Sequence, residues 1–155
     1  MSDAVIRPFR PADQDQVVDL IIGIQRGEFG LAITLADQPD LTAIPDIYRC
    51  RGGNFWVAER DGTVVGTIGL IDAGDGLGVI RKMFVASADR GGRPSLAQGL
   101  VDALVAHARA ENFRMLVLGT VERMHAALRF YARNGFTAVL PGALPAQFPR
   151  MPVDT

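Results

Sequence analysis

Apolar residues recur along the chain with helical spacing in two long segments. Positions three and four residues apart predict an amphipathic helix over 13–27. A longer stripe of the same kind predicts a second helix over 96–108. The apolar members are Val17, Leu20, Ile21 and Ile24 in the first segment, and Leu96, Leu100, Val101, Leu104, Val105 and Ala108 in the second.

Two further segments are predicted to be helical, the first of them with a weaker pattern. One covers 37–51 and is interrupted or restarted at Pro45, and the other covers 122–134. Gly135 follows the second segment at the position where a left-handed residue is expected to end a helix.

Short apolar runs bounded by turn residues predict the strands. Asp61-Gly62 joins two of them and is a strong signal for a hairpin. The full order is β-α-α-β-β-β-α-β-α-β-β, which predicts an α/β or α+β layered fold. The predicted strands are 4–7, 54–59, 64–71, 79–85, 115–118, 136–140 and 151–153.

Composition narrows the class of protein. A chain of 155 residues, 48% of them hydrophobic, suits one domain over 1–155 with a substantial core. The formal net charge of −1 argues against a nucleic-acid partner, which requires a basic face. No apolar run approaches the roughly 20 residues of a membrane span, and the N-terminus lacks a signal-peptide pattern. We therefore expect a cytoplasmic protein without a membrane partner.

Residues that bind metals are scarce. Cys50 is the single cysteine, and His107 and His125 are the two histidines, so we expect no metal site and no internal disulfide. Among the 16 basic residues, Lys82 is the one lysine.

The segment 79–108 carries the first candidate chemistry, because a strand there leads through a loop rich in Gly and Arg into a helix. Such a loop presents free backbone N–H groups at the positive end of the helix dipole, which suits a phosphate. Arg90 and Arg93 would add charge-assisted contacts. Taken alone, the sequence Arg-Gly-Gly-Arg at 90–93 fits a solvated loop equally well.

Other familiar motifs do not fit. Gly74, Gly76 and Gly78 precede a strand, and the third glycine is not at the spacing that a dinucleotide fingerprint requires. A hairpin connection is therefore expected. The sequence contains no Gly-Lys-Ser/Thr of a P-loop and no Gly-x-Ser-x-Gly elbow of a hydrolase.

Three segments in the right order resemble the N-acetyltransferases of the GNAT superfamily. They are Arg-Lys-Met-Phe-Val at 81–85, the loop and helix start at 89–98, and the run from His125 to Gly-Phe at 125–136. The resemblance covers essentially the whole chain, and the segments 54–58 and 148–151 extend it to a bacterial subgroup. It implies a mixed, mostly antiparallel twisted sheet of six to seven strands flanked by about four helices.

The cofactor loop departs from the family pattern Arg/Gln-x-x-Gly-x-Gly/Ala. The helix register places Ser95-Leu96-Ala97 at the final Gly-x-Gly/Ala, so the loop carries a two-residue insertion after Arg90-Gly91. Ser95 replaces a glycine, and Pro94 removes one N–H donor. Serine still offers its own N–H and adds a hydroxyl.

The resemblance implies acetyl-CoA as the cosubstrate, held between the strands 79–85 and 115–118. Its pantetheine would pair with the backbone at 83–85, and its pyrophosphate would meet N–H groups of the loop 91–97. The implied binding residues are Met83, Phe84, Val85, Arg90, Gly91, Gly92, Arg93, Ser95, Leu96, Ala97, Gln98, Ala127 and Tyr131.

The resemblance further implies direct attack of an amine on the thioester. Tyr131 occupies the family's position for the acid that protonates the leaving thiolate, and its alternative is a core aromatic beside Phe130. Glu122 and Glu28 are the candidate bases for the attacking amine, and a water chain is an equal alternative.

Several other residues have expected positions. Strand alternation predicts that the adjacent Arg81 and Lys82 point to opposite faces of their strand. His125 is expected on a helix surface and His107 in a structural role. Core or acceptor-wall positions are expected for Phe55, Trp56 and Phe84, and a semi-buried one for Cys50.

The sequence thus predicts an acetyl-CoA-dependent N-acetyltransferase acting on a small amine, an amino acid or a peptide amine. The same fold with another acyl donor or an oxygen acceptor is one alternative. A non-catalytic domain that binds acyl-CoA or regulates another protein is a second, and the changes at Pro94 and Ser95 favour it. The resemblance also makes a homodimer plausible.

Overall fold

The computed structural model describes residues 4–91, 95–119 and 125–137. Within them the strands form one five-stranded sheet in the order β1-β2-β3-β4-β5. Neighbouring strands are antiparallel from β1 to β4, and β5 runs parallel to β4. The bounds are β1 Val5–Pro8, β2 Asn54–Arg60, β3 Thr63–Gly74, β4 Leu77–Val85 and β5 Met115–Leu118.

Two tight turns connect the central strands. Asp61 and Gly62 both have positive φ, of 51° and 82°, which matches the twist of a two-residue hairpin turn. Asp75 and Gly76 repeat this pattern between β3 and β4, with φ of 55° and 78°. The predicted hairpin at Asp61-Gly62 and the predicted connection at Gly74–Gly78 are therefore confirmed.

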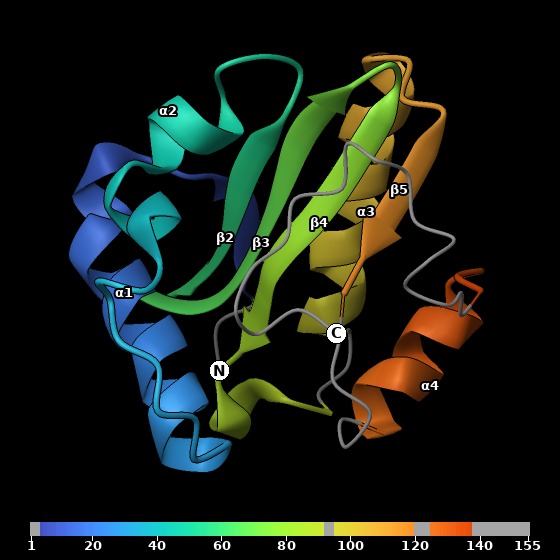
Figure 1. Cartoon of the computed structure of the whole chain (residues 1–155). Coiled ribbons are helices and arrows are strands. Elements are labelled where there is room, and N and C mark those ends of the chain that lie inside the picture. The colour runs from blue at the N-terminus through green and yellow to red at the C-terminus, as the bar shows by residue number, and fades with distance from the viewer. Residues whose placement is uncertain (1–3, 92–94, 120–124, 138–155) are drawn as a thin grey trace.

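The helices cover both faces of the sheet (Figure 1). Helix α3, Leu96–Ala110, packs on one face, which we call the α3 face. Helices α1, Gln14–Ile22, and α2, Ile44–Tyr48, pack on the opposite face, which we call the α1/α2 face. Helix α4, His125–Arg133, follows β5.

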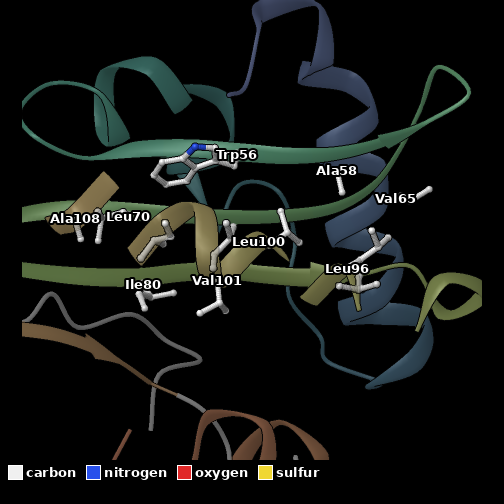
Figure 2. Packing of buried hydrophobic residues seen from close by; sticks show 12 residues of the cluster. Trp56, Ala58, Val65, Leu70, Ile80, Leu96, Leu100, Val101 and Ala108 are labelled. Carbon is white, nitrogen blue, oxygen red and sulfur yellow. The ribbon is translucent and has the colours of Figure 1, made fainter. Parts of the chain in front are cut away.

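Each face has its own core, because neighbouring residues of a strand point to opposite sides. On the α3 face, apolar side chains of α3 meet those of the sheet (Figure 2). Trp56 also packs edge to face against His107, with 5.2 Å between ring centroids, and His107 Nε2 lies 2.7 Å from the Gly52 carbonyl oxygen. These contacts agree with the structural role expected of His107. Phe55 and Val57 lie in the α1/α2 core, together with Phe9, Val17, Ile21, Leu41, Ile44, Tyr48 and Val64.

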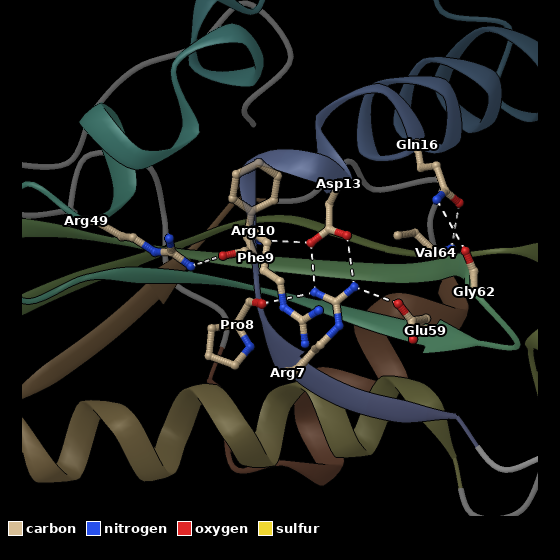
Figure 3. A network of polar contacts seen from close by, with 10 residues as sticks. All are labelled: Arg7, Pro8, Phe9, Arg10, Asp13, Gln16, Arg49, Glu59, Gly62 and Val64. Carbon is tan, nitrogen blue, oxygen red and sulfur yellow. Dashed lines mark hydrogen bonds and ion pairs between the residues drawn. The ribbon is translucent and has the colours of Figure 1, made fainter.

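The side chain of Arg7, on β1, connects the 3-10 turn Pro11–Asp13 before α1 to strand β2 (Figure 3). The Arg7 guanidinium donates to both carboxylate oxygens of Asp13, at 2.8 and 2.9 Å, and to Glu59 on β2 at 2.7 Å. Asp13 also accepts the Arg10 N–H at 2.8 Å. The hydrogen bonds from Arg7 hold the pKa of Asp13 below its ordinary value.

Several predicted elements differ from the structure. The helix predicted over 13–27 ends as an α-helix at Ile22 and continues as a π-helix, Gly23–Glu28. The helix predicted over 37–51, interrupted or restarted at Pro45, is a 3-10 turn, Pro39–Thr42, followed by the short α2, which begins at Ile44. Proline suits the first turn of a helix and cannot donate within one, which agrees with Pro39 and Pro45 each lying in the first turn of a short element.

The predicted number of strands and the predicted burial of Cys50 also differ from the structure. The described residues form five strands, and most of the two late strands predicted at 136–140 and 151–153 lies outside them. The fold class is otherwise as predicted. Cys50 is exposed and not semi-buried, because α2 ends at Tyr48 and Cys50 lies in the bend before β2.

Candidate active site

Strand β4 is paired on both edges over only half of its length. Residues Leu77 to Ile80 pair with β5, whose last residue, Leu118, lies opposite Ile80. From Arg81 to Val85, β4 keeps its β3 partner, while β5 has ended. Among the described residues, the edge of 81–85 that faces away from β3 has no strand on it. An extended ligand can add to such an edge as another strand would.

A β-bulge at Lys82 lies at the start of this edge. Arg81 pairs with Gly69 and Phe84 with Thr67, so two residues of β4, Lys82 and Met83, oppose one residue of β3. Lys82 has a φ of 56°, in the left-handed region. Its carbonyl accepts a hydrogen bond from the Thr67 hydroxyl at 2.7 Å.

The bulge overturns the prediction that Arg81 and Lys82 point to opposite faces. Gly69, the partner of Arg81, faces α2, because a Cβ on it would lie 2.6 Å from the Tyr48 ring. Directly paired residues share a face, so Arg81 lies on the α1/α2 face. The Lys82 ammonium reaches Gln38 and Asp40 on the same face. The extra residue of the bulge shifts the alternation by one, and both side chains are buried there.

The side chain of Lys82 enters a group of buried polar side chains that we call the polar network. The amides of Gln25 and Gln38 exchange two hydrogen bonds of 2.9 and 2.8 Å, and Gln38 also accepts from Lys82. The Asp40 carboxylate accepts from the Tyr48 hydroxyl at 2.6 Å, and its Oδ2 lies 3.9 Å from Lys82 Nζ. The polar network therefore links the π-helix, the 3-10 turn and α2 to the bulge of β4.

Sequence reasoning did not find Gln25, Gln38 or Asp40. Glutamine and aspartate are ordinarily exposed, and Gln38 and Asp40 lie in the segment 37–51, whose helical pattern is weak and interrupted. The one available signal was Gln25 directly after Ile24, on the buried side of the predicted helix.

The loop after β4 brings two predicted site residues together. The Arg90 guanidinium donates to Glu28 at 2.6 and 3.0 Å, and Arg90 Nε donates to the Val85 carbonyl at 2.9 Å. Arg90 was predicted to bind the cofactor and Glu28 to act as a base. Gly91 has a φ of 73°, a conformation that favours glycine. Gly92, Arg93 and Pro94 lie outside the described residues.

The loop leads into the N-terminus of α3, where Ser95 is the cap. Its Oγ accepts from the Gln98 N–H at 3.2 Å, so the serine that replaces a glycine holds the first helical turn. Leu96 and Ala97 precede the first position at which a helical N–H finds a carbonyl in its own helix. Their N–H groups are thus available to an anion.

Gln98 also joins α3 to the end of α4. Its amide bonds to Asn134 at 2.7 and 3.2 Å and to Asp102 at 2.8 Å. Its side chain is therefore occupied by a contact between helices, although it was predicted to bind the cofactor.

Tyr131 lies on α4, half-buried between two aromatic rings. Its ring centroid lies 5.6 Å from that of Phe130 and 5.8 Å from that of Phe136. Burial raises the pKa of Tyr131 to about 12, because the phenolate would lose its hydration. The phenol therefore keeps its proton at neutral pH. Glu122 lies outside the described residues, and for Ala127 and His125 only the helix backbone is described.

Comparison with known proteins decides the family. The sequence profile of the Acetyltransferase (GNAT) family matches residues 24–136, well over half of the chain. The chain belongs to the GNAT acetyltransferase family. This acetyltransferase is 35% identical over 128 residues to the IAA acetyltransferase of Azospirillum brasilense, covering 79% of this chain and 78% of that protein.

Solved structures give the same result for the fold. A GNAT-family acetyltransferase from Staphylococcus aureus Mu50 superposes with a TM-score of 0.93 at 33% identity, covering 98% of this chain and 94% of the other. An acetyltransferase from Streptococcus agalactiae 2603 superposes with a TM-score of 0.92 at 31% identity, covering 99% and 95%.

Family membership identifies the enzyme class, and the family as a whole uses acetyl-CoA. Within the described residues, no three side chains of the metal-binding types come together. Helices long and apolar enough to cross a membrane are likewise absent from the described part of the chain.

Proposed function

We propose that this acetyltransferase transfers the acetyl group of acetyl-CoA directly to a primary amine: a small amine, an amino acid or a peptide amine. The observation that carries the proposal is the edge of β4 over 81–85, beyond the end of β5 and next to the loop that begins α3. A linear amide such as pantetheine adds to an edge of this kind by backbone hydrogen bonds.

The residues around this edge fit the parts of acetyl-CoA. The pantetheine would pair with the backbone of Met83, Phe84 and Val85. The pyrophosphate would meet the N–H groups of Leu96 and Ala97 at the positive end of the α3 dipole, and Gly91 permits close approach of the loop. Arg90 lies beside Val85, and because its guanidinium pairs with Glu28, it can bind the pyrophosphate only if that ion pair opens.

The thioester of acetyl-CoA supplies an activated acetyl group. In the transfer, the amine nitrogen forms a bond to the carbonyl carbon as the bond from carbon to sulfur breaks. The sulfur then takes a proton, and we assign its donor as Tyr131, because this residue stands at the family's position for the acid and carries its proton at neutral pH. The attacking nitrogen gives up its proton to a base or to water.

We retain Glu122, Glu28 and a water chain as candidates for this base. Glu28 is held by two hydrogen bonds to Arg90, so it can accept a proton only if that ion pair opens. A Glu28→Gln variant with an unchanged pH dependence of turnover would remove Glu28 from this list.

The proposal is tested by calorimetric titration with acetyl-CoA and with free CoA, followed by a thiol-release assay over primary amines. We expect saturable binding of both ligands and release of free CoA that depends on an amine. Tyr131→Phe should lower kcat about 100-fold and leave the acetyl-CoA Kd within twofold, since the phenol acts in the transfer step.

Each contrary outcome has a separate meaning. Failure to bind either ligand would reject the proposed site. Binding without turnover of any amine would favour the non-catalytic alternative, and amine-independent turnover with alcohols would favour an oxygen acceptor. Unchanged kcat in Tyr131→Phe would reject Tyr131 as the acid.

A further inference from the structure

The Thr67 hydroxyl makes a hydrogen bond at the point where the ladder between β3 and β4 is interrupted. The regular pairing breaks between Thr67 and Gly69, where two residues of β4 oppose one of β3. There the Lys82 carbonyl accepts from Thr67 Oγ1 at 2.7 Å. Thr67 itself is fully buried. A side-chain hydroxyl, in place of a backbone N–H, thus bonds the bulge to β3.

This hydrogen bond fixes the direction of the peptide group between Lys82 and Met83. Thr67 lies on β3, so the Lys82 carbonyl points towards β3. The C=O and N–H of a planar trans peptide point in opposite directions, so the Met83 N–H points away from β3. Strand β5 ends opposite Ile80, before this position. The Met83 N–H therefore faces the edge over 81–85 that has no strand on it among the described residues, which we call the open edge.

The peptide group needs such a support, because the residue before it has an unfavourable backbone conformation. Lys82 has a φ of 56°, a value that favours glycine and is uncommon for residues with a side chain. The hydrogen bond from Thr67 acts on the peptide group itself, whereas the one from Lys82 to Gln38 acts at the far end of the lysine side chain. Thr67 therefore controls the orientation of this peptide more directly than the polar network does.

We propose that Thr67 is a positioning residue for acetyl transfer, whose hydroxyl aims the Met83 N–H at the carbonyl oxygen of the thioester. This inference rests on the proposed function, which places acetyl-CoA along the open edge. The carbonyl oxygen gains negative charge as the amine attacks, and a donor already directed at it stabilises the transition state more than the bound substrate. Thr67 acts only through the peptide, so its loss should slow the transfer without weakening acetyl-CoA binding.

The test compares two substitutions of Thr67 that each remove one part of its side chain. Thr67→Val keeps the shape and removes the hydroxyl, whereas Thr67→Ser keeps the hydroxyl and removes the methyl group. With an amine that the thiol-release assay identifies as an acceptor, Thr67→Val should lower kcat about tenfold or more and leave the acetyl-CoA Kd within about twofold. Thr67→Ser should keep kcat within about threefold of the wild type.

The serine variant separates positioning from packing, because it loses buried apolar contacts that the valine variant retains. A purely structural role would therefore slow Thr67→Ser at least as much as Thr67→Val. The matched control is Thr63→Val, which makes the same change at an exposed position of β3 and should match the wild type. Wild-type kcat in Thr67→Val, or equal losses of kcat in the two Thr67 variants, would overturn the proposal.

Two further measurements cover the remaining cases. If Thr67→Val does not fold, or if no amine is turned over, a crystal structure of the wild type with acetyl-CoA decides. The Met83 nitrogen must lie about 3 Å from the thioester oxygen while the Thr67 hydroxyl bonds to the Lys82 carbonyl, and any other arrangement rejects the proposal. Calorimetric titration of the wild type with acetyl-CoA identifies a failure of the proposed function, which would abolish binding. A failure of the Thr67 proposal alone would leave binding intact and the turnover of Thr67→Val at the wild-type level.

Discussion

The two faces of the sheet are built from different kinds of side chain. The buried residues that α3 contributes are all apolar, and they pack on apolar residues of β2, β3 and β4. The α1/α2 face has an apolar core as well, but it also holds the polar network and the buried Arg81. The two faces therefore bury similar hydrophobic residues and differ in their buried charge.

This difference indicates that the two faces have different roles. Buried polar groups contribute little net stability and are costly when a partner is lost, whereas apolar burial stabilises without directional requirements. The α3 face therefore serves mainly to stabilise the fold and to present the N-terminus of α3. The α1/α2 face holds the bulge of β4 and the groups beside it in a fixed arrangement.

The largest effect is expected from removing apolar volume on the α3 face. Leu100 is fully buried, and its Cδ1 would lie 3.0 Å from a Cβ at Gly66, so the packing there is tight. Leu100→Ala should lower the free energy of unfolding by about 3 to 5 kcal/mol, as measured by urea denaturation. At temperatures where the variant is folded, acetyl-CoA affinity and kcat should match the wild type. A large loss of kcat in folded protein would contradict the assignment of a mainly stabilising role to the α3 face.

An intermediate effect is expected in the polar network. Gln38→Leu removes the partner of both polar atoms of the Gln25 amide and one acceptor of Lys82, and should cost about 2 to 3 kcal/mol of unfolding free energy. Turnover should fall with it, because Lys82 is no longer held at the bulge.

The matched control for this variant is Gln16→Leu. Gln16 also bonds through its amide, to Val64 and Gly62, but its side chain is exposed, so its removal leaves no buried polar side chain without a partner. Its cost should stay below about 1 kcal/mol. Equal losses in the two variants would show that burial does not set the energetics of the network.

A pH-dependent effect of about 2 kcal/mol is expected at Asp13, on the edge of the α1/α2 face. The pKa of Asp13 is lowered in the folded protein, first by its hydrogen bonds from Arg7. The stabilisation is therefore fully present above the unfolded pKa of about 4 and is lost as the pH falls through the lower folded value. Asp13→Asn should be less stable than the wild type at pH 7, and the difference should shrink toward pH 2 in urea denaturation curves. A difference independent of pH would contradict this assignment.

The smallest effect is expected at the start of α3. Ser95→Ala removes the cap of the Gln98 N–H and should cost about 1 kcal/mol of unfolding free energy, whereas Ser95→Gly should cost a few tenths. Acetyl-CoA affinity, measured by calorimetry, should change less than twofold in both variants. A tenfold loss of affinity would instead assign the serine hydroxyl to the cosubstrate.

The sequence predicted the parts of this fold that depend on local pattern. The strand 115–118 and the turn at Asp61-Gly62 are found at the predicted positions, since short apolar runs and glycine turns are encoded by neighbouring residues. The helix predicted over 37–51 was right about the restart near Pro45 and wrong in its extent, because Pro39 and Pro45 each lie in the first turn of a separate short element.

The site was predicted less completely, because its arrangement depends on contacts distant in sequence. The loop residue Arg90 was identified, but not its bonding to Glu28, 62 positions earlier. The bulge at Lys82 arises from a shift of register between β3 and β4, which no pattern within β4 encodes. Asp40 was missed for the same reason, since its partners lie on α2 and on β4.

Lys82 makes the reaction of this chain with amine-reactive reagents simple to interpret. It carries the one ε-amino group of the whole sequence, and 9% of its surface is exposed. An amine-reactive reagent can therefore modify the folded chain readily at its α-amino group alone, and a second addition requires the α1/α2 face to open. The rate of that second addition, followed by intact mass, reports local opening at one defined atom without any engineered label.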